Sequence, residues 1–452
     1  MTMVELLDTT TIDRLAKQLK EPTWITELRR RALESHSRLP WPHPSDDIWR
    51  RTDVTLLDPF QGFSPTSSAL MERIPVQESR LADFTQPLGD EQLAVRANGS
   101  WLITPRSNES SRSGGVIVQE LVQAAHARPD GIRQTLEADG LTEAEQKLAS
   151  LNIAFHHDDV LVEIPGGHAS TEPLRLVHLF SVSGKQALFP LTLVKVGAGS
   201  SLTLIDEYVS LAATPFGVSV ADDQTPHLIN GRIEIVLEPD ARLHYVRLQR
   251  WNAQAREFLF QRATLARGAE LTMANINLGA ALSKAHIVTK LVGEQASTRL
   301  YGFVFGRGTQ HIDQHTLQDH QAPRTSSDLQ FRAALQDRSR MIYTGLIRIA
   351  NQAKQTTAYQ ANHNLLLSQT AKAETIPMLE ILADDVQCKH GASIGPIDDE
   401  QAFYLMSRGI PREIAQRLLV MGFVEPIVQQ IPFEPLRQRL REEIEGVIDS
   451  SS

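Results

Sequence analysis

The sequence predicts a mainly β protein, built as a long coil of stacked strands with helical regions before and after it. Two observations lead to this prediction. Short runs rich in β-branched and aliphatic residues recur through the middle of the chain, with few helical patterns between them. Small-residue turns of similar sequence precede several of these runs, as in repeat proteins whose units stack around a shared core. The length of 452 residues also favours two or three structural units.

The first region, residues 1–155, is predicted to be mostly helical. Trp24, Leu28 and Ala32 recur at spacings of four, which places them on one helical face. Further along, the acidic residues that follow Thr142 are typical of a capped helix start. These patterns favour several short helices that pack through one apolar face each.

The second region, residues 156–395, changes to β patterns. Its clearest strand candidates are Val160–Ile164, Leu191–Val196 and Arg232–Leu237. Strands that alternate with helices would indicate a doubly wound fold, but helical patterns are scarce here. We therefore expect strands that follow one another directly.

Three similar turns in this region predict a repeat. Each turn ends in a leucine, and these leucines are Leu202, Leu243 and Leu271. The intervals between them are 41 and 28 residues, which fits one regular repeat and one repeat with an insertion. Repeats of this size stack to bury a common core, so the pattern favours a coiled β-structure over a sandwich.

The third region, residues 396–452, is helical again. Asp398 has the position of a helix cap, and Pro411 is suited to the first turn of the next helix. A charged terminal helix carries the apolar stripe Leu436, Leu440 and Ile444. Such amphipathic helices could cap the open end of a solenoid or form a docking surface, and the pattern leaves both open.

Composition restricts the function classes. The net charge of −9 argues against broad binding to nucleic acid, which needs a basic surface. The chain start is acidic where a signal peptide is basic, and no window approaches about 18 uninterrupted apolar residues. The single cysteine, Cys388, cannot form an intrachain disulfide, which is typical of a reducing compartment. We expect a cytoplasmic protein that binds neither nucleic acid nor membrane.

His311, Asp313 and His315 form one candidate metal site. Alternate side chains of a strand share a face, so these three could converge on one divalent metal, with His320 close by in the sequence. This interpretation makes the chain a metal-dependent β-solenoid enzyme. The alternative is a polar strand face that contacts water.

Cys388 and His390 form a second candidate site. They lie two residues apart, on one face of a strand, and both are soft or borderline metal ligands. Two ligands are too few for a closed site, so a second chain would have to complete any cluster. Spacing alone favours a buried structural cysteine beside a surface histidine.

Ser393 lies in a G-x-S-x-G pattern that spans Gly391–Gly395. Hydrolases with this motif require a histidine later in the chain. No histidine follows His390, so a triad in that order is excluded. We therefore interpret Ser393 as a turn residue.

Several long motifs resemble the SufB/SufD family of iron–sulfur cluster assembly proteins. The segments are Asp328–Gly345 (DLQFRAALQDRSRMIYTG), Thr357–Leu367 (TAYQANHNLLL), Pro377–Ala392 (PMLEILADDVQCKHGA) and Ile397–Ile410 (IDDEQAFYLMSRGI). The resemblance is dense from about residue 300 to 425, weaker across 160–300 and faint before that. Motifs of this length rarely arise by chance.

Within the family the chain is most similar to SufD. Its Ala383–Gly391 segment (ADDVQCKHG) has the SufD pattern, whereas SufB-type chains carry a Cys-Asp-Ser segment where this chain has Asn362, His363 and Asn364. The cysteine on which SufB-type scaffolds depend is therefore absent. The resemblance thus implies that this chain builds no cluster alone.

The resemblance implies a right-handed parallel β-helix over residues 156–395 between the two helical regions. It also implies pairing with a SufB-like paralogue through the β-helix, and docking of the SufC ATPase on residues 396–452. On this reading the chain is a scaffold subunit rather than an enzyme, and ATP binds to SufC only.

The resemblance further implies that His390, with Cys388 nearby, faces the SufB interface and contributes a metal ligand to a transient iron–sulfur cluster. No cofactor is then stably bound by the chain alone. Cluster type stays open, as does the role of Cys388, because a buried structural thiol would also explain it. A purely structural homodimer of β-helices, without metal or partner, is a further alternative.

Overall fold

The computed structural model of the chain describes residues 7–46, 48–52, 64–65, 78–104, 115–137, 143–181, 185–211 and 226–449. Its helices are α1 (Thr9–Leu19), α2 (Thr23–Arg38), α3 (Glu78–Thr85), α4 (Leu121–Ala127), α5 (Pro129–Leu136), α6 (Glu143–Phe155), α7 (Asp399–Ser407), α8 (Arg412–Val428) and α9 (Glu434–Asp449). The strands before the long regular stack are β1 (Ser64–Pro65), β2 (Gln92–Ala97), β3 (Ser100–Ile103), β4 (Ile117–Glu120), β5 (Asp158–Ile164), β6 (Leu174–Phe180) and β7 (Gln186–Leu188). The strands of the stack are β8 (Pro190–Val196), β9 (Ser201–Ser210), β10 (His227–Leu237), β11 (Arg242–Arg250), β12 (Ala255–Leu265), β13 (Glu270–Asn277), β14 (Leu282–Leu291), β15 (Ser297–Gly306), β16 (His311–His320), β17 (Ser326–Leu335), β18 (Arg340–Ile349), β19 (Thr356–Leu366), β20 (Lys372–Ile381) and β21 (Val386–Pro396).

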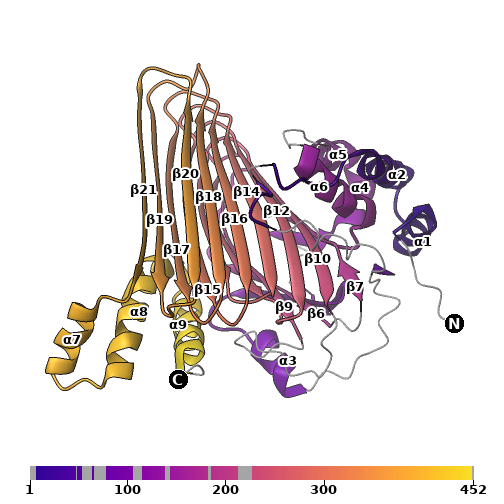
Figure 1. Cartoon of the computed structure of the whole chain (residues 1–452). Coiled ribbons are helices and arrows are strands. Elements are labelled where there is room, and N and C mark those ends of the chain that lie inside the picture. The colour runs from indigo at the N-terminus through magenta and orange to yellow at the C-terminus, as the bar shows by residue number, and fades with distance from the viewer. Residues whose placement is uncertain are drawn as a thin grey trace.

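Two long sheets face each other. Strands β8, β10 and on to β20 lie side by side in an 11-stranded sheet, the even sheet, while β9, β11 and on to β21 lie in a 10-stranded sheet, the odd sheet. From β8 onward each strand pairs in parallel with the strand two places later, so the chain coils from one sheet to the other. Figure 1 shows this stack, from β10 to the terminal strands β20 and β21. The predicted parallel β-helix with helices before and after it is confirmed.

The three turn leucines are register partners. Leu243 on β11 pairs with Leu202 on β9 and with Leu271 on β13. All three are at most 2% exposed and belong to the core between the sheets. The residues that lengthen the first interval lie between β9 and β10, and 212–225 among them fall outside the described residues. The repeat was therefore correctly predicted from sequence.

A residue in the left-handed backbone region marks the same corner of successive coils. The φ angles of these residues lie between 57° and 64° at Gly199, Asp240, Gly268, Gln295, Arg324 and Gln355. Each of these residues donates its N–H to a carbonyl one coil further on, as Asp240 does to Arg267 at 2.8 Å. The corners thus stack by hydrogen bonds in the same way as the strands.

The N-terminal region covers part of the outer face of the even sheet. Side chains from α1, α2, α4, α5 and α6 pack against outward-facing residues such as Leu191, Leu228 and Phe258. The same region also extends both sheets, because β4 pairs with β5 and β2 pairs with β6. The prediction of a mostly helical region omitted these strands, which are only four to six residues long.

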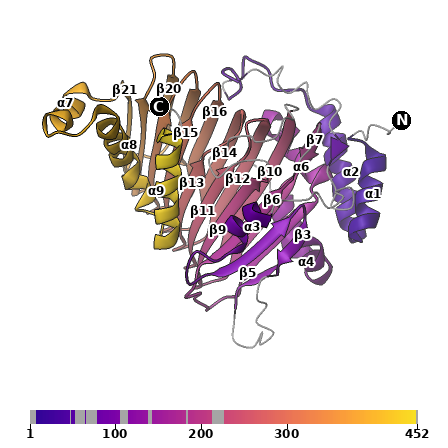
Figure 2. The ribbon, with the colours of Figure 1, turned by 90° about the horizontal axis from the view of Figure 1, so that it is seen from below.

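Helices α8 and α9 cover the outer face of the odd sheet. Leu436, Leu440 and Ile444 of α9 are at most 1% exposed and pack with outward-facing residues such as Ile276 and Phe303. The predicted apolar stripe is confirmed. Figure 2 shows α8 and α9 along the side of the stack, so these helices do not cap its end. Among the described helices, none is long and apolar enough to cross a membrane.

A buried ion network fixes α9 to the odd sheet. Arg250 of β11 donates to both carboxylate oxygens of Glu443 on α9 at 3.0 Å and to Glu207 on β9 at 2.8 Å. Glu207 also accepts a hydrogen bond from Arg175 at 2.7 Å. Burial alone would raise the pKa of Glu207, but Arg175 and Arg250 outweigh it and hold this pKa well below its usual value.

We predict that Arg250→Met destabilises the protein by about 3–5 kcal/mol, because it leaves two carboxylates buried with fewer cations. Denaturant unfolding at pH 7 measures this loss. Arg30→Met is the control, since the Arg30–Asp13 pair is more than half exposed on both sides, and it should change stability by less than about 0.5 kcal/mol.

The loss in Arg250→Met should depend on pH. A carboxyl with a depressed pKa in the folded state stabilises the fold above its unfolded pKa and loses this contribution as pH falls. The difference between wild type and variant should therefore shrink below about pH 4. A difference that is constant from pH 7 to pH 3 would contradict the assigned role of Glu207.

Candidate functional site

The last coil leaves one end of the solenoid uncovered. Strands β20 and β21 are the final members of the even and odd sheets, and within the described residues no strand pairs with their outer edges. Figure 1 shows both at the far side of the stack from the N-terminal helices. Unpaired main-chain donors and acceptors at such edges are a template for a further strand.

The inward face of this last coil is apolar. Leu379 and Ile381 on β20 are 37% and 40% exposed, whereas their register partners Ile347 and Ile349, one coil earlier, are fully buried. Ile394 on β21 is 44% exposed above the buried Asn364. The last coil therefore presents the side chains of a solenoid core without the next coil that would bury them.

Cys388 and His390 belong to this uncovered face. In the parallel register Cys388 pairs with Ala358 and His390 pairs with Gln360, and both partners are at most 2% exposed. The two candidate ligands thus point the same way, toward the space between the sheets, where His390 is exposed and Cys388 is half-buried. The structure brings these two sequence-predicted residues together.

The thiol of Cys388 is held in its neutral form. It packs against a small apolar cluster that includes Ile347, Ile349 and Ala358. Burial raises the pKa of Cys388, and a backbone hydrogen bond with Ala358 offsets only part of this. A thiol binds metal as the thiolate, so Cys388 becomes a ligand only when an incoming metal displaces its proton, which leaves to water or to a base of the partner.

His311, Asp313 and His315 lie together on the outer face of the even sheet, but a lysine occupies the position that a metal would need. The Lys284 ammonium donates to Asp313 Oδ2 at 2.6 Å, while His315 Nε2 lies 2.9 Å from Asp313 Oδ1. The Thr52 hydroxyl also donates to Asp313 and lies 3.3 Å from His311 Nε2. No group of three or more His, Cys, Asp or Glu among the described residues could hold a metal ion.

His320, the predicted fourth ligand, points away from this cluster. It lies inside the solenoid, where its nitrogens are hydrogen bonded to Thr325 at 2.8 Å and Ser327 at 2.9 Å. The metal-enzyme interpretation is therefore wrong for these residues.

The shared face of His311, Asp313 and His315 follows from strand periodicity, but the counter-ion comes from the neighbouring coil. Lys284 lies 29 residues before Asp313, one repeat away, which is the signal that sequence reasoning missed.

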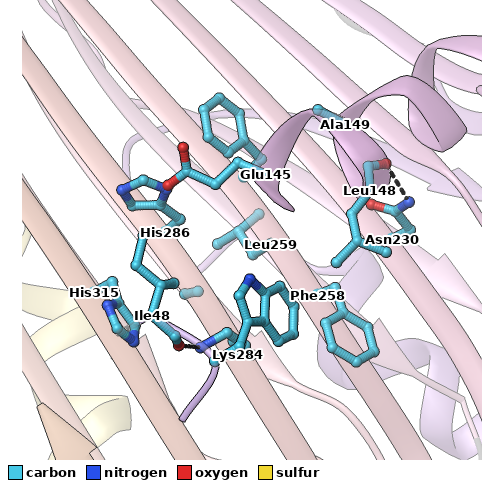
Figure 3. A pocket seen from close by; sticks show the side chains of 13 residues that line it. Ile48, Glu145, Leu148, Ala149, Asn230, Phe258, Leu259, Lys284, His286 and His315 are labelled. Carbon is cyan, nitrogen blue, oxygen red and sulfur yellow. Dashed lines mark hydrogen bonds and ion pairs between the residues drawn. The ribbon is translucent and has the colours of Figure 1, made fainter. Parts of the chain in front are cut away.

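This buried cluster holds the segment Ile48–Thr52 on the even sheet. Figure 3 shows the Lys284 ammonium bonded to the Ile48 carbonyl, with His286 and His315 beside it. Lys284 also lies 4.6 Å from the ring centroid of Trp49, which stacks on Phe258. The cavity between them has a volume of about 40 Å³, enough for little more than water.

The pKa shifts of the cluster fit an ion pair surrounded by neutral histidines. Burial, together with His315 and Lys284, lowers the pKa of His286 to about 3. Burial also lowers the pKa of His315. Burial alone would raise the pKa of Asp313, but Lys284 and His315 hold it low. At neutral pH the Lys284–Asp313 ion pair is therefore a structural clamp flanked by neutral histidines.

Exposed apolar side chains gather on α7 and α8. Phe403 and Tyr404 on α7 are 70% and 58% exposed, and Met406 and Leu418 are also exposed. Asp398 caps α7, because its carboxylate accepts from the N–H groups of Glu400 and Gln401, as predicted. Figure 1 shows α7 projecting away from the sheets. An aromatic patch on a projecting helix is typical of a protein-docking surface.

Comparisons with known proteins support the sequence resemblance. The family model described as "SUF system FeS cluster assembly, SufBD core domain" matches residues 179–423, more than half of the chain. A relative named iron–sulfur cluster assembly protein SufD, from Bacillus subtilis, is 28% identical over 94% of both chains. SufBD family proteins of Synechocystis and Staphylococcus epidermidis are 25% and 23% identical, over 96% and 97% of this chain and 95% and 93% of their own. The predicted family and its SufD-like character are confirmed.

We predict that Lys284→Met destabilises the fold by about 3–5 kcal/mol, because Asp313 is left buried without its cation. Adding Asp313→Asn should recover most of this loss, as denaturant unfolding of the four proteins of the cycle would show. Lys195→Met is the matched control, because the Lys195–Glu238 pair is exposed. Stoichiometric zinc on the wild-type chain, lost on His315→Ala, would restore the metal interpretation.

Proposed function

Because the chain belongs to the SufB/SufD family of iron–sulfur cluster assembly proteins, we propose that it is a SufD-type scaffold subunit. In this proposal it pairs with a SufB-like paralogue and docks the SufC ATPase, and it catalyses no reaction itself. The observation that carries the proposal is the uncovered end of the solenoid. Two open strand edges and an apolar face surround Cys388 and His390 there.

The chemistry of the uncovered end fits a half-site. Pairing with a second β-helix would continue both sheets and bury Leu379, Ile381 and Ile394, which supplies a hydrophobic driving force. The imidazole of His390 is a borderline ligand that suits iron. This chain supplies two ligands at most, so a nascent cluster, as cargo, would take its other ligands from the partner. Asn362, His363 and Asn364 stand where SufB-type chains carry their cysteine.

The projecting patch on α7 is the proposed SufC contact. Phe403 and Tyr404 offer aromatic anchors of the kind that dominate interface energies. Helix α8, which follows α7, packs on the odd sheet. A displacement of α7 would therefore be transmitted to the strands through α8. We propose that ATP-driven motion of SufC acts on the uncovered end by this route.

We predict that this chain, a SufB-type protein and SufC co-elute as one complex in size-exclusion chromatography with light scattering. Leu379→Asp should remove the SufB-type protein from that complex, because it places a charge on the apolar face. Met378→Asp is the control, since Met378 is equally exposed on the opposite face of β20. Separate peaks for the three wild-type proteins would overturn the proposal.

The same experiment separates the two docking surfaces. Phe403→Asp should release SufC and leave the SufB-type protein bound. Leu102→Asp, which alters an exposed leucine on β3 at the other end of the stack, should release neither. Loss of both partners in Phe403→Asp would contradict two independent surfaces.

We predict that His390→Ala leaves the fold and the complex intact but lowers cluster transfer to an apo-acceptor by at least about tenfold, because an inner ligand is lost. Absorbance and circular dichroism of the acceptor cluster measure this transfer. Lys389→Ala, a change at the adjacent exposed residue on the other face, is the matched control. Equal transfer by His390→Ala and wild type would overturn the assignment of His390 as a cluster ligand.

A further inference from the structure

A row of three side chains crosses the outer face of the odd sheet from helix α8 to strand β21. Arg332 on β17 pairs in register with His363 on β19, and His363 pairs with Ser393 on β21. Their neighbours Phe331 and Asn362 are buried on the inward face, so the row lies on the outward face. Residues 61 positions apart in sequence are thereby aligned across three strands.

Direct contacts fix both ends of the row. The Arg332 guanidinium donates to the Phe423 carbonyl of α8 at 2.6 Å and lies 5.1 Å from the centroid of the Phe423 ring. At the other end, His363 Nδ1 and Ser393 Oγ are 2.7 Å apart in a hydrogen bond. Asn364 donates to the Ser393 carbonyl at 3.3 Å as a second tie between the two strands.

The sequence interpretation of Ser393 as a turn residue is wrong, because Ser393 lies within strand β21. The hydrogen bond to His363 supplies the histidine that the G-x-S-x-G pattern lacked in chain order. A nucleophilic serine also needs a histidine base that a carboxylate orients. Here burial and the cationic Arg332 lower the pKa of His363, and no described carboxylate is hydrogen bonded to it. The pair therefore acts as a hydrogen-bonded tie between two strands.

Strand β21 is where such a tie has most effect. Among the described strands, it pairs only with β19, so its position depends on one ladder and on the Ser393 contacts. His390 lies three residues before Ser393 on the same strand and points to the opposite face. Opening of an edge strand is a local equilibrium that one hydrogen bond can shift.

We propose that the Arg332–His363–Ser393 row couples helix α8 to strand β21, and that His363 is a positioning residue for His390. When α8 shifts, Arg332 moves with the Phe423 carbonyl, and its distance from its register neighbour His363 changes. His363 in turn holds or releases Ser393 and with it the edge strand. The role for His390 rests on the function proposed above, whereas the coupling between α8 and β21 does not.

Hydrogen exchange of the full-length isolated chain tests the coupling. His363→Leu and Arg332→Met should each speed amide exchange in β21 about fivefold, the effect of losing about one hydrogen bond. The double variant should exchange no faster than either single variant, since the two residues act in series. His363→Asn, which keeps a polar atom near the position of Nδ1, should restore the wild-type rate.

Gln387→Ala is the matched control, because Gln387 is an exposed residue of β21 that pairs with Thr357 away from the row. It should leave exchange at Ser393 and His390 unchanged. The proposal is overturned if Arg332→Met affects α8 and β17 only, or if the two single effects multiply. A wild-type unfolding midpoint for His363→Leu, together with faster exchange in β21, separates a local tie from general destabilisation.

A second measurement relates the row to function. Adding SufC to the wild-type chain should slow exchange in β21, and adding it to His363→Leu should not. If SufC fails to bind the wild-type chain, the proposed function fails while the exchange result on the isolated chain stands. If SufC binds and slows β21 equally in both proteins, the row does not carry the coupling.

Discussion

Each coil of this molecule is stabilised mainly by the coils on either side of it. In the described part of the stack, each parallel strand pairs with the strands one coil before and one coil after, and the inward side chains stack in the same order. A stack of this kind has no single central core. The first and last coils each have one neighbouring coil, so they are the least stabilised and the most exposed parts of the structure. At the N-terminal end, the antiparallel additions β3 and β4 close the stack with short strands. At the other end, β20 and β21 leave apolar residues such as Leu379 exposed.

Buried ion pairs determine where the outer helices and the Ile48–Thr52 segment attach to the sheets. Where the helices and the Ile48–Thr52 segment meet the sheets, arginine and lysine are buried with carboxylates, as in Arg250 with Glu443 and Lys284 with Asp313. Buried pairs add little net stability compared with apolar packing, but a mismatched register leaves a charge without its partner. In a repetitive sheet, where one coil resembles the next, such pairs define which coil each helix contacts.

Much of the fold could be predicted because it depends on local periodicity. The leucines at Leu202, Leu243 and Leu271 marked the repeat, and the stripe on α9 marked a buried helix face. Alternation along β16 and β21 also identified which candidate residues share a face. The partners of a side chain on a strand come from the neighbouring coil, and they depend on the register of the sheet. The contacts of Lys284 with Asp313 and of His363 with Ser393 could therefore not be predicted from one strand alone.

The half-buried thiol of Cys388 has a practical consequence, because the chain contains no other cysteine. Any thiol-specific fluorophore or spin label must attach at the uncovered end of the solenoid, with no engineering of the rest of the molecule. The rate of that labelling depends on how often the apolar cluster around Ala358 opens and on whether another surface covers β21. The protein thus carries an intrinsic reporter of whether the uncovered end is covered.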